Sequence, residues 1–452
     1  MYTRPLHHGL YFILITAAAI GLLLVLILYA RLYAFLALFI VSMGLGLAAG
    51  MPPAKVLTSM QAGVGDALSF IAVVVGLGAI IGRFLQYSGG GRVLADWLLL
   101  KAGPRHAQWA VLTTAFLVGL PVFFEIGFII LAPLSWNLAR ESKRPLLLFG
   151  LPIAAALTVT HALVPPHPAP AVAAQLMGAD VGRTILWGAL LSIPLMIVSG
   201  IFYGGWIARR ISPPIPALAG THNGQAESEF APPSLPLTIF LLVLPLLLIV
   251  AATLADLFHL PATAAYKFLG HPFTALLLTT LGCMYFLGRL RGLKGDRITK
   301  IATESLAPLA TLLLVIGGGG ALKQIIVDSG IGSYLGKLLS ESPLSPLLVC
   351  FLTSAGLRAA QGSATVAIVT AAGILAPLMK QLHGYSPEIL VLAICCGGTT
   401  ISHVNDAGFW LVKEYMGMTV AETLRSWTAM KVVMGVLGIV IVFICQAVFF
   451  HS

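Results

Sequence analysis

Residues 158–171 read TVTHALVPPHPAPA and residues 397–410 read GGTTISHVNDAGFW, each within a longer apolar stretch of the chain. The motif TVTH at 158–161 returns as TISH at 400–403. Prolines in the first stretch and clustered polar residues in the second interrupt what would otherwise be continuous helices. Two related, interrupted helices in one chain indicate a duplicated fold.

Three further matches occur in the same order in both parts of the chain. Any one match could arise by chance in a chain so rich in Ala, Gly and Leu, but four collinear matches are hard to explain by composition. We therefore predict two related halves, 1–207 and 236–452, joined by a linker at 208–235. The matches are Phe35, Ala37, Leu38, Gly44 and Gly50 with Phe273, Ala275, Leu276, Gly282 and Gly288; Gly76, Gly78, Ser88, Gly89 and Gly91 with Gly317, Gly319, Ser329, Gly330 and Gly332; and ILAPL at 130–134 with ILAPL at 374–378.

The composition indicates a protein embedded in a lipid bilayer. Hydrophobic residues form 58% of the 452 residues and charged residues only 9%, and apolar runs long enough to cross a bilayer recur along the chain. We therefore expect an all-α polytopic membrane protein with five transmembrane helices and one re-entrant hairpin in each half. The predicted spans are 9–30, 32–50, 66–83, 145–163 and 184–207, then 236–259, 271–290, 301–322, 386–410 and 431–450; the hairpins are 107–140 and 344–380, and the broken helices 145–176 and 386–410.

The distribution of basic residues predicts that the halves lie in opposite orientations. Cytoplasmic loops are enriched in Lys and Arg. Residues 51–66 contain only Lys55 as a basic residue, whereas the equivalent 289–304 contain five. The bias reverses in the next two loops, and Arg209 with Arg210 places the linker in the cytoplasm. The formal charge of +10 thus reads as a topology signal, because the basic residues do not follow one soluble face that could bind nucleic acid.

The first half supplies ionisable candidates at its two helix breaks. Glu125 lies in GLPVFFEIGF, where a carboxyl group is costly to ionise, so it is a candidate proton carrier; a structural Glu paired with an Arg is the alternative. His161 and His167 flank the prolines of the broken helix. Histidine titrates near neutral pH and donates hydrogen bonds to anions, so His161 is a candidate for both proton coupling and substrate binding. His167 is as readily explained by a bond to a carbonyl.

The second half supplies mainly neutral donors. In LRAAQGSATVA at 357–367 we expect opened helix ends with polar side chains suited to a carboxylate and hydroxyl groups. Arg358 either balances an anion or forms a salt bridge. Asp406 is a second candidate proton carrier, or it orients His403. The substrate-binding candidates of this half are Arg358, Gln361, Gly362, Ser363, Thr365, Ser402, His403 and Asn405.

The chain lacks the sequence motifs of several other classes of protein. The chain contains no HExxH, GxSxG or GxxxxGK[ST] motif, and its five cysteines lie in apolar stretches without metal-type spacing. We expect no cofactor, no metal and no ATP-driven transport. GGGG at 317–320 follows an apolar helix and favours close helix packing over phosphate binding. A channel or an intramembrane enzyme with the same polar centre remains an alternative.

The motifs at these breaks resemble the gluconate permease family of bacterial inner-membrane carriers. The segments that carry the resemblance span nearly the whole chain: PVFFEIGFIIL from Pro121, HALVPPHPAP from His161, VDSGIG from Val327, QGSATVA from Gln361 and SHVNDAGFW from Ser402.

The resemblance implies a multi-pass, proton-coupled symporter of the inner membrane that takes up gluconate or a related small hydroxy acid. It also implies an elevator-type, dimeric carrier working by alternating access. Members of the family transport gluconate, idonate, fructuronate or D-serine, and His161 within its segment looks closer to the sugar-acid members. We therefore expect the carboxylate near His161 and residues 361–365, hydroxyl groups near Ser402 and Asn405, and the proton on Glu125.

Overall fold

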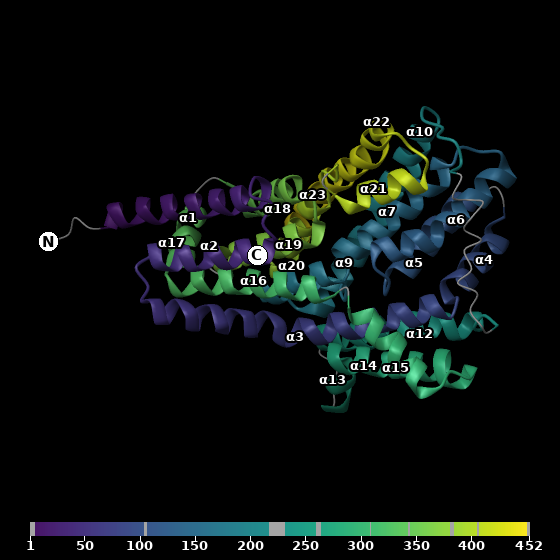
Figure 1. The fold of residues 1–452 in the computed structure, drawn as a ribbon, viewed down its shortest axis with the longest axis horizontal. Helices are drawn as coiled ribbons and strands as arrows, with labels where there is room; N and C mark the ends of the chain where they lie inside the picture. Colours follow the sequence, from purple (N-terminus) through teal and green to yellow (C-terminus); the bar gives the residue numbers. More distant parts are fainter. Residues whose placement is uncertain are drawn as a thin grey trace.

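The computed structural model describes residues 5–103, 106–216, 231–258, 264–307, 309–341, 344–379, 384–404 and 406–449, and the statements below concern these residues. They are helical throughout, with turns between the helices and no strand. Figure 1 shows an elongated bundle in which α2, α3 and α16 run alongside one another. Half of the predicted linker, residues 217–230, lies outside the described residues.

The helices follow the same order before and after the linker: outer helices, a hairpin, a broken helix and a long last helix. In the first part they are α1 (Pro5–Leu28), α2 (Ala34–Ala48), α3 (Pro53–Tyr87), α4 (Gly90–Ala102), the hairpin α5 (Ala107–Gly119) and α6 (Phe124–Ser142), the broken pair α7 (Leu147–Leu163) and α8 (Pro168–Met177), and α9 (Val181–Met196), which continues through a π-helical segment η2 (Ile197–Tyr203) into α10 (Gly204–Ala208).

The second part repeats this order. It contains α12 (Leu235–Leu257), α13 (Ala264–Gly270), α14 (Pro272–Gly282) continued by η3 (Cys283–Gly288) and η4 (Arg289–Arg291), α15 (Gly295–Leu306), α16 (Leu309–Asp328), α17 (Ile331–Ser340), the hairpin α18 (Pro346–Gln361) and α19 (Ala364–Met379), the broken pair α20 (Pro387–Thr399) and α21 (Ala407–Tyr415), then α22 (Val420–Thr423), η5 (Leu424–Thr428) and α23 (Ala429–Phe449).

The hairpins and broken helices form the centre of the molecule. Almost every residue of α7 and every residue of α20 after Pro387 is buried, as expected of helices that are apolar on all sides. Within each part the first helix of the hairpin packs on the first helix of the broken pair, α5 on α7 and α18 on α20. Across the parts, α19 packs on α8 and α21 on α6. Both breaks are thereby brought to one region.

Small residues let α16 approach α3 and α19 closely. An added Cβ at Gly63 of α3 would lie 2.3 Å from the carbonyl oxygen of Gly320 in α16, and one at Gly373 of α19 would lie 2.8 Å from that of Gly319. The backbones therefore touch where a larger side chain would separate them. This confirms the helix-packing interpretation of GGGG at 317–320.

Eight helices in the described part of the chain are long and apolar enough to cross a membrane. The predicted spans 32–50 and 386–410 correspond to shorter helices, α2 and α20. Helix α3 begins at Pro53, well before the predicted span at 66–83. The predicted span 301–322 was wrong at its start: its first residues belong to the separate helix α15, whose charged side chains favour solvent, and the apolar helix begins at Leu309.

Candidate functional site

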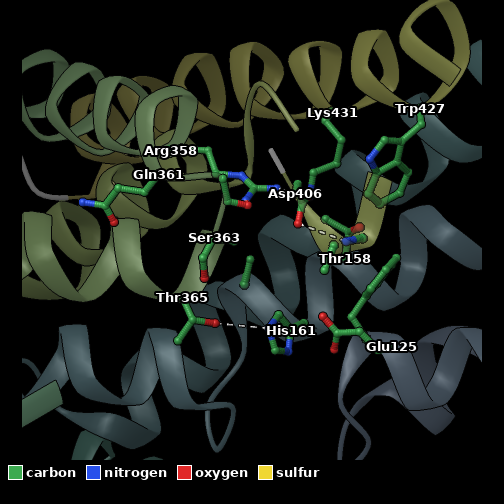
Figure 2. A pocket seen from close by; sticks show the side chains of 16 residues that line it. Glu125, Thr158, His161, Arg358, Gln361, Ser363, Thr365, Asp406, Trp427 and Lys431 are labelled. Atoms are coloured by element: carbon green, nitrogen blue, oxygen red, sulfur yellow. Dashed lines mark hydrogen bonds and ion pairs between the residues drawn. The ribbon is translucent and has the colours of Figure 1, made fainter. Parts of the chain in front are cut away.

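A cavity of about 280 Å³ lies where the hairpins meet the broken helices (Figure 2). Its walls come from both parts of the chain, at the beginnings of α6, α19, α21 and α23 and the ends of α7 and α18. The lining residues are Phe124, Glu125, Thr158, His161, Ala162, Arg358, Gln361, Gly362, Ser363, Ala364, Thr365, Asp406, Ala407, Gly408, Trp427 and Lys431.

Three helices begin at this cavity, and each has a lining residue in its first turn. They are α6 at Phe124, α19 at Ala364 and α21 at Ala407. The first backbone N–H groups of a helix have no partner within it, and the N-terminal end carries a partial positive charge. Phe123, which precedes α6, provides no side-chain cap. The uncapped start of α6 therefore favours negative charge in the cavity, whereas Ser363 and Asp406 cap α19 and α21.

Local sequence explains why the helices break here. Prolines at 165, 166 and 168 lack the N–H groups that would continue α7. Gly362 ends α18 with φ of +80°, a conformation that other residues adopt at a cost. Ile401 has φ of +37° in the break after α20. Each break leaves polar groups that only protein or a cavity can satisfy inside a membrane.

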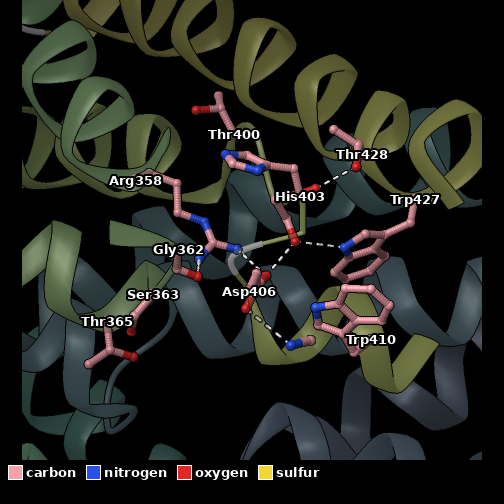
Figure 3. Close-up of polar contacts among 12 residues, drawn as sticks. Arg358, Gly362, Ser363, Thr365, Thr400, His403, Asp406, Trp410, Trp427 and Thr428 are labelled. Carbon is pink, nitrogen blue, oxygen red and sulfur yellow. Dashed lines mark hydrogen bonds and ion pairs between the residues drawn. The ribbon is translucent and has the colours of Figure 1, made fainter. Parts of the chain in front are cut away.

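A network of hydrogen bonds fixes Arg358 and Asp406 (Figure 3). The Arg358 guanidinium donates to the carbonyl oxygen of Gly362 and forms an ion pair with Asp406. Asp406 also accepts from the Ser402 hydroxyl and, at 3.0 Å, from the backbone N–H of Gly408, so it caps α21. Trp427 Nε1 donates to Ser402 Oγ at 2.7 Å. Asp406 thus orients Arg358, and the prediction that it orients the His403 side chain was wrong.

The two histidines of the first broken helix have different surroundings. His167 is buried, and its Nε2 lies 2.6 Å from the carbonyl oxygen of Gly119, to which it must donate. It therefore holds the tip of the first hairpin. His161 faces the cavity, with Nε2 3.4 Å from Thr365 Oγ1 on the second hairpin, while its buried Nδ1 has no partner among the described residues.

Two further charged groups face the cavity. Glu125 lies in the first turn of α6 and makes no ion pair with any described residue. Lys431, near the start of α23, is only 4% exposed. Its Nζ lies 5.1 Å from the centre of the Trp427 ring, a cation–π contact. The cavity therefore holds two acidic and two basic side chains.

Neutral polar groups complete the lining. Both amide atoms of Gln361 and the hydroxyl oxygen of Thr158 are buried without a partner in the described part of the chain. Ser363 Oγ accepts from Val366 N at 3.3 Å and so caps α19. Buried polar groups normally find hydrogen-bond partners, so the free groups of Gln361 and Thr158 are available to a polar ligand. No cluster of three or more potential metal-ligating His, Cys, Asp or Glu side chains occurs among the residues described.

The structure gathers most of the predicted site residues and separates two others from them. Glu125, His161 and Asp406 line the cavity, as do Arg358 and the predicted residues of the hairpin tip. Ser402 is fully buried behind Asp406, and His403 Nε2 lies 2.9 Å from the Ala359 carbonyl oxygen. Both were predicted to bind substrate, but their side chains do not line the cavity. The predicted ligand Asn405 lies outside the described residues.

Three cavity residues with polar side-chain groups were not predicted from the sequence, namely Thr158, Trp427 and Lys431. Thr158 belongs to the repeated TVTH motif and lies one turn before His161. Lys431 is the only charged residue in the apolar run 430–450. An ionisable side chain inside a membrane span is by default a functional candidate, so this signal was present in the sequence.

A bundle of membrane-spanning helices whose breaks enclose a polar cavity is the architecture of a membrane transporter. The chain belongs to the GntP permease family: residues 11–448 match the family model described as GntP family permease. It is therefore a multi-pass protein of the inner membrane and not an enzyme.

Curated relatives match the chain over nearly their full length. The chain is 40% identical to the High-affinity gluconate transporter of Escherichia coli (strain K12), over 95% of this chain and 98% of that protein. It is 40% identical to the Gluconate permease of Pseudomonas aeruginosa, over 98% and 99%. It is 38% identical to the Gnt-II system L-idonate transporter of Escherichia coli (strain K12), over 96% and 99%.

Solved structures share the fold at low sequence identity. The Alcanivorax borkumensis YdaH transporter has a TM-score of 0.65 at 16% identity, covering 87% of this chain and 88% of that one. MtrF of Neisseria gonorrhoeae also has a TM-score of 0.65, at 19% identity, covering 86% and 84%.

Proposed function

We propose that this protein is a secondary active transporter that takes up gluconate or a related small hydroxy-acid anion together with a proton. The observation that carries the proposal is the cavity, which combines three helix N-termini, two cationic side chains and free neutral hydrogen-bonding groups. The helix N-termini suit a carboxylate, and the neutral hydrogen-bonding groups suit hydroxyl groups. The names of the relatives, two of them gluconate carriers and one an L-idonate carrier, support the same substrate class.

The charges of the cavity supply a reason for proton coupling. With all four charged groups ionised, Arg358 and Lys431 balance Glu125 and Asp406. A monoanionic substrate would leave this cavity with one excess negative charge, and a proton on Glu125 would remove it. Uncompensated charge is costly in a low-dielectric barrier. The empty cavity and the cavity holding both anion and proton are then the two neutral states able to cross.

Glu125 is the proposed proton carrier because the Asp406 carboxylate already forms an ion pair and accepts hydrogen bonds from the protein. The Asp406 carboxylate accepts from Arg358, Ser402 and Gly408, all of which favour its ionised form. Glu125 has no such ion-pair partner among the described residues and faces the cavity directly. His161 is the second proposed participant in proton transfer, since its Nδ1 has no hydrogen-bond partner among the described residues.

We further propose that the halves 1–207 and 236–452 are inverted repeats that work by elevator-type alternating access. The repeated helix order and the charge bias of the loops support the inversion. The hairpins and broken helices would form the moving unit and carry the cavity across the membrane. The outer helices would form the scaffold and the contact of a homodimer.

Uptake into proteoliposomes tests the proposed function. Purified protein should accumulate labelled gluconate against its gradient when the outside is acidified, and dissipating the pH gradient with a protonophore should remove the accumulation. Downhill flux that ignores the pH gradient would favour a channel. Chemical conversion of the substrate without transport would contradict the family assignment.

A further inference from the structure

The cavity contains two cations, and they have different surroundings. We propose that Lys431 is the residue that binds the carboxylate of the transported acid, and that the hydroxyl-bearing tail extends towards Gln361. This inference rests on the proposed function and adds to it the orientation of the substrate and the residue that selects for an acid. The sequence motifs instead predict the carboxylate near His161 and residues 361–365, and they leave Arg358 open between balancing an anion and forming a salt bridge.

The hydrogen bonds of the Arg358 guanidinium are made to other groups of the protein. Its guanidinium donates to the Gly362 carbonyl at the end of α18 and is paired with Asp406. That carboxylate is itself held by Ser402 and Gly408. A substrate carboxylate that bound Arg358 would have to compete with the carboxylate of Asp406, which is held in place by several hydrogen bonds. Breaking such a pair leaves a buried charge uncompensated.

Lys431 has no such partner. It is 4% exposed and forms no ion pair among the described residues, although it lines the cavity. Its Nζ lies over the face of Trp427, which attracts a cation, and no described residue accepts a hydrogen bond from the ammonium group. The hydrogen-bonding capacity of this buried ammonium is therefore available to an anion that enters the cavity.

The opposite wall provides the groups for the rest of the ligand. Figure 2 shows Gln361, Ser363 and Thr365 on the side of the cavity away from Trp427 and Glu125. The amide oxygen and nitrogen of Gln361 are both buried and unpaired among the described residues. One amide can donate to one hydroxyl group and accept from another. This side of the cavity therefore offers neutral hydrogen-bonding groups to the hydroxyl groups of a ligand whose carboxylate lies at Lys431.

Binding of gluconate and of its neutral isostere D-gluconamide to purified protein tests the assignment. Lys431→Met should weaken gluconate binding by about 30-fold or more, the loss expected when one partner of a buried charged pair is removed. The dissociation constant of gluconamide should change by less than about threefold, because the amide carries no charge for Lys431 to neutralise. Lys431→Arg should recover most of the gluconate affinity, and Lys101→Met, at an exposed site on α4, should behave as the wild type.

The melting temperature of the ligand-free variants separates binding from structure. Removing an unpaired buried cation should leave Lys431→Met as stable as the wild type or more stable. Equal losses of gluconate and gluconamide binding, or a melting temperature well below that of the wild type, would show a structural role and overturn the assignment. So would wild-type selectivity for gluconate in Lys431→Met. A wild-type protein that binds no gluconate would instead overturn the proposed function.

Discussion

Arg358 at the end of α18 and Asp406 at the start of α21 form a buried ion pair that joins the second hairpin to the second broken helix. The side chains are only 2% and 14% exposed. The pair lies in the wall of the cavity, and it fixes the C-terminal end of α18 relative to the start of α21. The geometry of the site therefore depends on a contact between residues 48 positions apart in sequence.

Asp406→Ala should destabilise the protein, because it leaves the Arg358 guanidinium buried without its carboxylate. The expected cost is about 3–5 kcal/mol, measured as a lower melting temperature in detergent together with lost uptake. The double variant Arg358→Met, Asp406→Ala should regain much of this stability without regaining transport. If the single and double variants were equally unstable, the ion pair would not be the source of the loss.

Glu125→Gln should abolish accumulation driven by a pH gradient while retaining gluconate binding and exchange. The amide has the shape and charge of the protonated carboxyl group, so the loaded cavity stays neutral but cannot release a proton. Counterflow and proton-driven uptake in proteoliposomes measure the two properties separately. Glu141→Gln, at an exposed position near the end of the same helix, is the matched control. Full accumulation by Glu125→Gln would remove Glu125 from the coupling mechanism.

Gly63→Ala should destabilise the contact between α3 and α16. The added methyl group would lie 2.3 Å from the Gly320 carbonyl oxygen, so the helices must separate, at a cost of roughly 1–3 kcal/mol. Gly65→Ala in the same helix meets nothing within 4 Å and should be neutral or stabilising by up to about 1 kcal/mol, from helix propensity. Thermal unfolding of the two variants gives the comparison. Similar melting temperatures would contradict the close packing.

Gln361→Leu should weaken gluconate binding about tenfold, because the ligand loses hydrogen bonds to the amide. Stability should be unchanged or higher, since a buried amide without a protein partner is replaced by an apolar group of similar size. Isothermal titration and thermal unfolding measure the two effects. Unchanged affinity would place the substrate hydroxyl groups elsewhere in the cavity.

Residues in the interrupted motifs were the most predictable part of the site. Glu125 and His161 stood out as ionisable groups in apolar runs, and residues 361–365 as a polar break. Ser402 and His403 occur in an equally polar segment, yet their side chains bond to Trp427, Asp406 and Ala359. An irregular segment has no fixed periodicity, so its sequence does not reveal which side chains point inwards.

The sequence by itself determined the membrane environment, the helical fold class and the breaks at which polar groups collect. These follow from local properties: the length of the apolar runs, proline and glycine at helix ends, and polar residues at positions where exposure to lipid would be costly. Only the tertiary structure decided which charges are paired. The pairing of Arg358 with Asp406 and the free position of Lys431 depend on how α18, α21 and α23 pack together. Electrostatic pairing acts over a few ångströms in space, which sequence separation does not encode.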